Sequence, residues 1–517
     1  MRAPRRLRVG LPRALVPKDQ VNADRLAFGQ AIWGFKMSDP GSPLSPSPES
    51  PGQNLESALG AAEDVEAGSA VPKSKIISWA FWDWAGASFN AVATTFVFAV
   101  YLTSDGTFTD TFTANRYLSI GMTIAGIFIA LLAPITGQRA DRSGKGVRVL
   151  GWFSLLIFLS LAAMFFVAPD SPLGPTGALW LGIGLLGVGN VFFEFASVNY
   201  NAMLNDLSTP KNRGAISGFG WGAGYVGGIV LLLFLYFSFI NPEVGLFGVT
   251  SENGLNVRVA MLFAALWFGI FATPVLVNPP KKKKIERDLP RETLADSYRH
   301  LFHTVKSLWF EARDTLKFLI ASAIFRDGLA GVFTFGGVIA GSVFGFSAGQ
   351  VIIFAIVANI VAGIATWSFG PINDRWGSKR VIMVSLIIMV FAGLGVFFFY
   401  DAGQWVFWVF GLGLTIFVGP VQSASRTFLA NIIPKGREGE VFGLYATTGR
   451  AVSFLAPMMY ALAVSFGDLV SPDGTNATHW GIVGVILVIL LGLALMIPVR
   501  SKEARITDVK IPGAKKE

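Results

Sequence analysis

Residues 137–148 read Gly-Gln-Arg-Ala-Asp-Arg-Ser-Gly-Lys-Gly-Val-Arg, a short basic stretch between two long apolar runs. A second version, Gly-Pro-Ile-Asn-Asp-Arg-Trp-Gly-Ser-Lys-Arg, occupies residues 370–380 and is again flanked by apolar runs. In each copy a Gly is followed four places on by Asp-Arg, and another Gly comes two places after that Arg. A loop repeated in the same context predicts one structural unit that is used twice.

The composition places the chain in a membrane. Of its 517 residues, 52% are hydrophobic and 15% are charged, whereas a soluble protein of this size carries about 25% charged residues. The charged residues gather in short loops. The apolar segments between these loops are about 20 residues long, which is enough to cross ~30 Å of hydrocarbon. We therefore expect an all-α, multi-pass membrane protein.

The net charge of +9 and the absence of Cys narrow the possible functions. In a soluble domain such a charge would suggest nucleic acid, but loops that face the cytoplasm collect Lys and Arg, so we expect no nucleic-acid partner. A chain without Cys has no disulfide, thiol nucleophile or Cys-ligated metal. Because the sequence also shows no nucleophile–base grouping and no metal-ligand cluster, we expect no enzyme activity, no cofactor and no metal.

The apolar runs can be counted from Ile76 onward, and they predict twelve transmembrane helices. The spans are expected near residues 76–102, 116–138, 147–168, 177–204, 214–240, 257–277, 316–341, 348–370, 381–400, 404–430, 440–466 and 479–498.

Loop charge predicts the orientation of these spans, because Lys and Arg accumulate on the cytoplasmic side. Alternate loops carry Arg139, Arg142, Lys145, Arg148, Lys211, Arg213, Lys281 to Lys284, Arg375, Lys379, Arg380, Lys435 and Arg437. The other loops carry Asp105, Asp110, Asp170, Glu243, Glu252, Asp401, Asp468 and Asp473. We expect the first set and both termini to be cytoplasmic, in a cell membrane (inner or plasma).

The regions outside the spans have distinct compositions. Residues 1–75 are expected to form a disordered cytoplasmic tail, since residues 38–72 are rich in Ser, Pro, Gly and Glu. The change in character at Met37 suggests the hypothesis that translation begins there and that residues 1–36 are not translated. A cytoplasmic loop, 279–315, separates the expected bundles 76–278 and 316–500, and residues 501–517 form a second tail. Within that loop, Leu294 to Phe310 has helical apolar spacing, so it is either a membrane-surface helix or a tether.

A second internal match supports the duplication. Leu204-Asn-Asp-Leu-Ser-Thr-Pro-Lys-Asn-Arg-Gly follows span four, and Ala430-Asn-Ile-Ile-Pro-Lys-Gly-Arg-Glu-Gly follows span ten. The Asp-Arg loops lie between spans two and three and between spans eight and nine, so equivalent places are marked in each half. Two six-helix bundles in parallel repeat, each with a Gly-x-x-x-Asp-Arg-x-Gly loop, resemble the major facilitator superfamily (MFS) over roughly residues 76 to 500.

A narrower resemblance is to the vacuole-effluxer branch, the autophagy-related permeases. It is carried by Ser78-Trp-Ala-Phe-Trp-Asp-Trp-Ala-Gly-Ala-Ser-Phe, by Tyr200-Asn-Ala-Met-Leu and by Gly218-Phe-Gly-Trp-Gly-Ala-Gly-Tyr-Val-Gly-Gly. Phe325-Arg-Asp-Gly is similar to that branch's Tyr-Asn-Asp-Gly pattern, from which Arg326 departs. The fungal namesake is linked to amino-acid efflux from the vacuole, so the resemblance implies a transporter without naming its cargo.

The repeated loop is predicted to be a gate on the cytoplasmic side. Asp141 is placed to accept hydrogen bonds from the start of span eleven, near Val441, where free amides and the helix dipole favour an anion. Asp374 would do the same at the start of span five. The competing interpretation, simple positive-inside anchoring, explains the basic residues but not a repeated Asp. The predicted gate comprises Gly137, Asp141, Arg142, Gly144, Lys145, Gly370, Asp374, Arg375 and Gly377, and its basic members are expected to meet anionic headgroups or carboxylates.

Charged residues inside the spans are the main candidates for a binding or coupling site, since each costs about 2.5–3.5 kcal/mol to insert. One hypothesis makes Arg450 the anchor for a substrate carboxylate and Glu194, Asp327 or Asp83 the proton-coupling acid. The other treats them as static ion pairs, for instance Asp327 with Arg450. The candidate site residues are Asp83, Asn90, Asn190, Glu194, Asn201, Trp221, Tyr225, Asp327, Gln422, Arg426 and Arg450.

Aromatic and small residues carry weaker signals. The candidates to line a cavity are Trp79, Trp82, Trp84, Trp221 and Tyr225, of which Trp221 and Tyr225 are one helical turn apart. Trp79 and Trp82, near the cytoplasmic surface, are expected to be interfacial anchors. The glycines from Gly218 to Gly228 are expected to permit close helix packing.

Together these features predict a secondary active transporter that works by alternating access. We expect proton coupling, a small polar metabolite such as an amino acid as cargo, contact with membrane lipids, and a monomer. An exporter of amphipathic compounds or drugs is the alternative cargo class. A membrane sensor or scaffold that transports nothing is the alternative of another kind.

Overall fold

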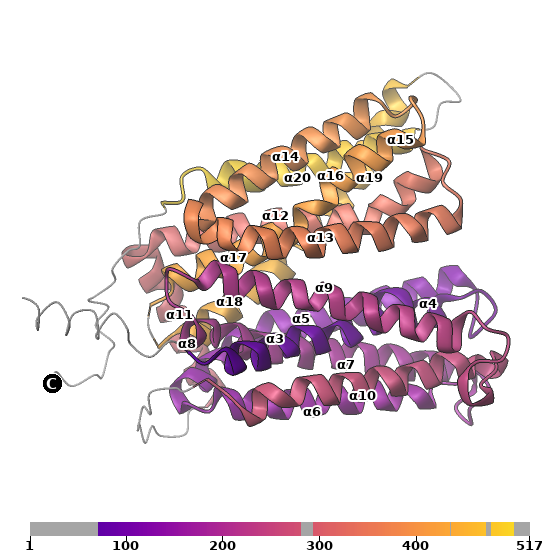
Figure 1. The fold of residues 1–517 in the computed structure, drawn as a ribbon, viewed down its shortest axis with the longest axis horizontal. Coiled ribbons are helices and arrows are strands. Elements are labelled where there is room, and N and C mark those ends of the chain that lie inside the picture. The colour runs from indigo at the N-terminus through magenta and orange to yellow at the C-terminus, as the bar shows by residue number, and fades with distance from the viewer. Residues whose placement is uncertain (1–70, 281–292, 435, 472–476, 501–517) are drawn as a thin grey trace, which may run out of the picture. The chain divides into compact units, whose positions relative to one another are not determined.

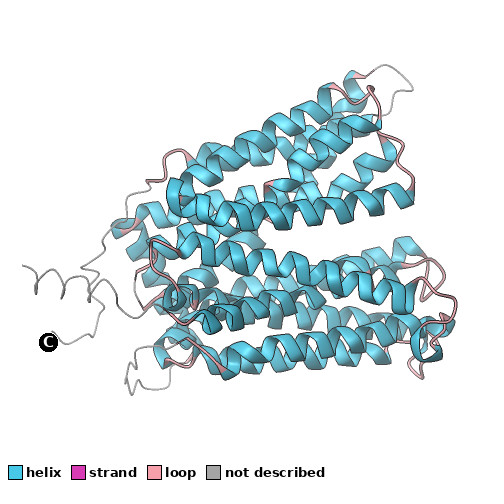
Figure 2. Ribbon diagram, in the orientation of Figure 1, coloured by secondary structure: helices cyan, strands magenta, loops and turns pink. Residues whose placement is uncertain are grey.

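In the part of the chain that the structure describes, twelve helices are long and apolar enough to cross a membrane, as the sequence predicted. The computed structural model describes residues 71–280, 293–434, 436–471 and 477–500. The predictions for the N-terminal tail, the Met37 start, residues 281–284 and the C-terminal tail lie outside these ranges. Residues 71–517 form one unit, and its described part is almost wholly helical (Figure 2).

The first six spans form the N-terminal bundle. Its elements are α3 (Lys73–Ala87), η1 (Ser88–Phe96), α4 (Phe98–Thr103), α5 (Thr111–Ser143), α6 (Gly146–Ala163), η2 (Met164–Phe166), α7 (Gly174–Ala202), α8 (Leu204–Leu207), α9 (Arg213–Leu235), η3 (Tyr236–Ile240), η4 (Leu246–Gly248), η5 (Glu252–Gly254) and α10 (Leu255–Val277). Within it α3 packs against α9 and α10, and α7 packs against α5 and α6.

The last six spans form the C-terminal bundle. Its elements are α12 (Arg313–Ser342), α13 (Ala348–Trp376), α14 (Ser378–Phe398), α15 (Gln404–Val406), η6 (Phe407–Gly411), α16 (Leu412–Ile416), α17 (Val418–Ile432), α18 (Glu438–Ala451), α19 (Leu455–Val470), η7 (Ala477–Trp480) and α20 (Gly481–Met496). Here α20 packs against α12, α14 and α19.

The two bundles meet most extensively through two helix pairs, α5 with α18 and α9 with α13 (Figure 1). These pairs are spans two and eleven and spans five and eight, so each is the counterpart of the other when the halves are exchanged. The contact therefore has the symmetry expected of a parallel repeat. We use "basic end" for the end of the bundles that holds the loops of Lys145, Lys211 and Arg375, and "opposite end" for the other.

The glycines of the repeated loop are explained by these crossings. A Cβ on Gly137 would lie 2.0 Å from the carbonyl oxygen of Gly439, and one on Gly370 would lie 3.1 Å from Cα of Ala215. The later glycines of the motif, Gly144 and Gly377, end α5 and α13 with φ of 63° and 84°, backbone angles that favour glycine. Each copy thus uses one glycine for contact and one to stop a helix.

Span one is not a regular α-helix along its length. Its middle part, η1, is π-helical, and the hydroxyls of Thr94 and Thr95 donate to the carbonyl of Asn90 at 2.6 and 2.7 Å. Asn90 and Thr95 are exposed and Thr94 is half-buried. Because lipid disfavours polar side chains at this depth, they favour a water-accessible lining, and π-helical turns occur often at functional sites.

Span eleven is broken near its centre. The α18 helix ends at Ala451 and α19 begins at Leu455. Asp327 of α12 accepts the backbone N–H of Ala456 at 2.6 Å, which satisfies a free amide at the start of α19. A discontinuous helix whose half-helix ends are satisfied by side chains is a feature of transporter cores.

The segment between the bundles contains a helix, α11 (Leu294–Glu311), which starts with a capping box formed by Thr293 and Asp296. Ser297 accepts from Arg139 at 3.1 Å, and the Tyr298 hydroxyl donates to the carbonyl of Leu131 at 3.1 Å. Arg437 of the C-terminal bundle hydrogen-bonds to Thr304. The helix therefore contacts both bundles, and its placement at a membrane surface remains a prediction.

Candidate functional site

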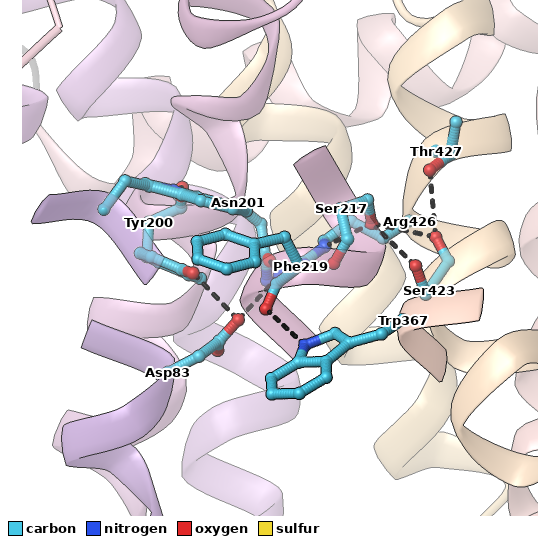
Figure 3. A network of polar contacts seen from close by, with 10 residues as sticks. Asp83, Tyr200, Asn201, Ser217, Phe219, Trp367, Ser423, Arg426 and Thr427 are labelled. Carbon is cyan, nitrogen blue, oxygen red and sulfur yellow. Dashed lines mark hydrogen bonds and ion pairs between the residues drawn. The ribbon is translucent and has the colours of Figure 1, made fainter. Parts of the chain in front are cut away.

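A buried ion pair joins the bundles toward the basic end. Arg426 Nη1 lies 3.2 Å from Asp83 Oδ2, and the two side chains are 2% and 16% exposed. The Tyr200 hydroxyl donates to the same carboxylate oxygen at 2.8 Å, and Arg426 also donates to Asn201 at 3.2 Å. Four charged and polar groups from α3, α7 and α17 thus satisfy one another (Figure 3).

Arg426 makes further bonds that tie α17 to α9. Its Nε donates to Ser217 Oγ at 2.9 Å and its Nη2 donates to the Ser217 carbonyl at 2.6 Å. The Ser217 hydroxyl in turn donates to the carbonyl of Ser423 at 3.0 Å. The guanidinium is thus bonded on all sides, which is the arrangement needed to hold a charge out of water.

Aromatic rings surround this pair, which we call the lower pair. The Cζ atom of Arg426 lies 4.9 Å from the ring centroid of Trp79, 5.2 Å from that of Trp221 and 5.9 Å from that of Tyr200. Such cation–π contacts stabilise a desolvated guanidinium. The lower pair therefore lies in a closed, dry environment between the bundles.

A second ion pair, the upper pair, lies nearer the middle of the spans. Arg450 Nη2 is 2.5 Å from Glu194 Oε1, and the side chains are 31% and 25% exposed. The same nitrogen donates to Asn190 Oδ1 at 3.3 Å. Counting from Glu438 at ~1.5 Å per residue, Arg450 is about 18 Å from the start of its helix. The upper pair joins α18 to α7 and is partly exposed.

Both Asp residues of the repeated loop contact the helix starts that the sequence predicted. Asp141 accepts the N–H of Glu440 at 3.0 Å. Asp374 accepts the N–H groups of Gly214 and Ala215 at 2.6 and 2.8 Å. Each carboxylate thus holds the first turn of a helix in the other bundle, where the free amides and the helix dipole stabilise an anion. The two Asp residues thus lie where the sequence placed them; a role in gating, and the other members of the predicted gate, remain a proposal.

The hydrogen bonds between the described parts of the two bundles are confined to the half of the spans near the basic end and to the middle. Those near the basic end include bonds of Ser217, Phe219, Arg213, Arg426 and the loop carboxylates. The bond from Thr447 to Ala130 at 2.9 Å and the upper pair are the deepest. Toward the opposite end the ribbons of α9 and α13 run apart (Figure 1).

Comparison with known proteins assigns the chain to a family. The model described as "Vacuole effluxer Atg22 like" matches residues 108–508, most of the chain. The chain belongs to the vacuole effluxer Atg22-like family. The sequence is 24% identical over 426 residues to the MFS-type transporter YxiO of Bacillus subtilis, a match that covers 81% of this chain and 93% of YxiO.

Two further similarities agree with this assignment. Autophagy-related protein 22-1 of Aspergillus fumigatus is 23% identical over 277 residues, a match that covers 49% of this chain and 44% of the fungal protein. The solved MFS proton:xylose symporter XylE shares the fold with a TM-score of 0.64 at 14% identity, covering 83% of this chain and 95% of XylE. The predicted family, the two-bundle MFS fold and a multi-pass membrane transporter rather than an enzyme are confirmed.

Within this vacuole effluxer-like fold, one predicted pairing is wrong. Asp327 was expected to pair with Arg450, but Asp327 accepts the amide of Ala456 and Arg450 pairs with Glu194. The break in span eleven explains the difference, because it creates a helix start that needs an anion next to Asp327. Glu194 is then the interior acid that is both paired across the bundles and exposed to water.

The prediction for two tryptophans is also wrong. Trp79 and Trp82 are 0% and 1% exposed, not interfacial. Trp79 stacks on Tyr200 with centroids 4.6 Å apart, and Trp82 stacks on the other side at 4.5 Å. Their position near one end of span one suggested interfacial anchors. Both indoles instead face α7, because the polar face of span one faces the interior of the bundle.

Other candidates have mixed positions. Asp83, Asn201, Trp221 and Arg426 meet in the lower pair, and Asn190, Glu194 and Arg450 meet in the upper one. Asn90 is exposed in η1, Gln422 is half-buried, and Tyr225 packs where Gly363 and Gly419 leave room. The expected role of the span-five glycines in packing is confirmed: a Cβ on Gly222 would lie 2.1 Å from the Trp367 ring.

Three residues that contact the lower pair were not among the predicted site residues: Tyr200, Trp79 and Ser217. Trp79 and Asp83 are four apart and share a helix face, so their spacing gave a usable signal. Tyr200 adjoins the candidate Asn201 within a recognised motif. Ser217 gave no signal, because its bonds depend on where α17 crosses α9.

Proposed function

We propose that this chain is a proton-coupled transporter of a small polar metabolite, such as an amino acid, which it moves by alternating access between the two bundles. The upper pair carries the proposal. It joins the bundles through ionised groups, it stands in the middle of the spans where the halves hinge, and water reaches it.

Proton coupling follows from the chemistry of the upper pair. Protonation of Glu194 would remove the charge that holds Arg450, so the bundles would separate there. Conversely, release of the proton would restore the pair. One proton that moves down ~100 mV supplies about 2.3 kcal/mol, enough for roughly a fifty-fold substrate gradient.

The lower pair and the two loop carboxylates act as the gate in this proposal. They close the basic end, while bonds between the described bundle residues do not extend to the opposite end. Since Lys and Arg mark the cytoplasmic side, the basic end and both termini are cytoplasmic and the structure represents an outward-open state of a cell-membrane protein. We further propose that the transporter is a monomer.

The direct experiment is transport by the purified chain in vesicles with a panel of amino acids and an imposed pH gradient. The proposal expects uptake of at least one amino acid, stimulated by the gradient and abolished by a protonophore. Uptake of amphipathic drugs alone would favour the drug-exporter alternative. If no panel member moves while the gate still opens and closes, a sensor or scaffold is the better description.

A further inference from the structure

One intramembrane cation has no carboxylate partner in the described part of the chain. Three arginines lie well inside the spans: Arg326, Arg426 and Arg450. Arg426 pairs with Asp83 and Arg450 pairs with Glu194. The ion pairs among the described residues include none to Arg326. An unneutralised guanidinium near the middle of a span is costly and calls for an explanation.

The contacts of Arg326 leave hydrogen-bonding capacity unused. Its Cζ atom lies 3.9 Å from the ring centroid of Tyr445, and Nη1 donates to the Tyr445 carbonyl at 3.3 Å. Its Nε is buried and has no hydrogen-bond partner. A guanidinium offers five N–H groups, and the fork they form matches a carboxylate in two-point geometry.

The guanidinium packs against a glycine of α18. A Cβ on Gly449 would be 3.4 Å from Arg326 Nη1, so the guanidinium lies close to the backbone of α18 at this point. The Arg326 side chain is only half-buried, so part of it stays accessible to a ligand. Gly449 directly precedes Arg450, so Arg326 contacts the same stretch of α18 that carries the upper pair.

The interior carboxylates, by contrast, have partners. Asp83 and Glu194 pair with arginines, and Asp327 accepts the amide of Ala456. Among the described interior residues, one guanidinium therefore lacks a carboxylate partner, whereas each carboxylate has a partner. This imbalance favours a cargo group that is negatively charged.

We propose that Arg326 binds the carboxylate of the transported molecule, so that the cargo is an organic anion or a zwitterion held by its carboxyl group. The proposal rests on the proposed transport function and moves the anchor from Arg450 to Arg326. Arg450 is then left to Glu194 and to the coupling of the bundles.

Bound cargo would also balance the charges inside the membrane-spanning core. A bound carboxylate would neutralise the remaining interior guanidinium beside the upper pair. Since Tyr445 and Gly449 belong to α18 and Arg326 belongs to α12, that carboxylate would contact two helices of the C-terminal bundle next to the hinge.

The test is arginine-selective labelling with phenylglyoxal, read by mass spectrometry at Arg326 in the purified full chain. Labelling is measured alone and with L-lactate, L-leucine or xylose, which are a carboxylate, a zwitterion and a neutral solute. We expect Arg326 to be labelled, and lactate, leucine or both to slow this labelling at least threefold while xylose does not. Protection by leucine alone would identify the zwitterion, and protection by lactate alone the simple anion.

Arg258 provides a matched control. It is also stacked on a ring, with Cζ 4.9 Å from the centroid of Phe165, and it too donates to a backbone carbonyl, through Nε at 2.6 Å. In vesicles, Arg326→Gln should weaken the apparent affinity for the protecting solute by about tenfold or more, and Arg326→Lys should restore it in part. Arg258→Gln should leave it unchanged.

Three results would overturn the proposal. They are an Arg326 that is not labelled, labelling that no carboxylate slows, and an Arg326→Gln variant that transports a carboxylate with wild-type affinity. Because labelling needs no transport, protection without uptake would refute the transport function alone. Uptake of a carboxylate without protection would refute only the site.

Discussion

The two ion pairs that cross between the bundles differ in their surroundings. The lower pair, Asp83 with Arg426, is nearly dry, ringed by Trp79, Trp221 and Tyr200, and bonded to Ser217 and Asn201. The upper pair, Glu194 with Arg450, is partly exposed and shares only Asn190.

This difference separates two tasks. Charges that hold several hydrogen bonds and are largely shielded from solvent are hard to part, so the lower pair suits a closed gate. A pair in contact with water can exchange a proton and separate at a small cost. In the proposed mechanism, the same chemical unit therefore serves as a clamp in one place and as a switch in the other.

The largest expected effect is from breaking the lower pair on one side. Arg426→Ala leaves Asp83 buried without its cation, which should cost about 3–5 kcal/mol. We expect a clear loss of thermal stability and no transport, measured on purified protein and in vesicles. The double variant Asp83→Asn/Arg426→Gln should recover much of the stability. An Arg426→Ala protein as stable as wild type would contradict the role of the lower pair as a clamp.

Removing the charge of the upper pair should affect coupling more than stability. Glu194→Gln is expected to abolish proton-driven accumulation and to spare exchange, with a stability change within about 1 kcal/mol because the pair is exposed. The measurement compares uptake with and without a pH gradient. An unchanged dependence on pH would exclude Glu194 as the coupling acid.

Replacing a loop carboxylate should have an intermediate effect on the stability of the closed basic end. Asp374→Asn weakens two charge-assisted bonds to Gly214 and Ala215, which should destabilise the closed basic end by about 1–3 kcal/mol. Cysteine substituted at Ala215 should then react faster with a water-soluble maleimide. Asp314→Asn, whose carboxylate faces Lys317 at 3.8 Å on α12, is the control. If the substituted Cys reacted with the maleimide equally fast in both variants, Asp374 would not hold the basic end closed.

The smallest effect should come from the capping box of α11, which touches neither ion pair. Hydrogen bonds from Thr293 hold the pKa of Asp296 below its usual value. This contribution is therefore complete at neutral pH and is lost only as pH falls through the lowered pKa. Thr293→Ala should speed hydrogen exchange in the first turn of α11 several-fold and leave transport unchanged; lost transport would show that α11 does more than connect the bundles.

The sequence predicted the fold and the contacts of the two loop carboxylates well, for a physical reason. Span length, loop charge and the repeated Asp-Arg motif are local signals, and the helix dipole dictates where a loop carboxylate binds. The partners of Asp327, Arg450 and Trp79 could not be predicted this way. Their contacts depend on the crossing of helices far apart in the chain and on a break in span eleven, and no Gly or Pro at residues 452–454 marks that break.

The most direct test of the central claim is the distance between the bundles at both ends, measured by double electron–electron resonance. Because the chain has no Cys, spin labels can be placed at Lys145 with Trp376 near the basic end and at Phe112 with Leu469 near the opposite end. Releasing the clamp with Asp83→Asn/Arg426→Gln should lengthen the first distance and shorten the second. Distances that stay fixed, or that change in the same direction, would contradict two bundles that rock about the ion pairs.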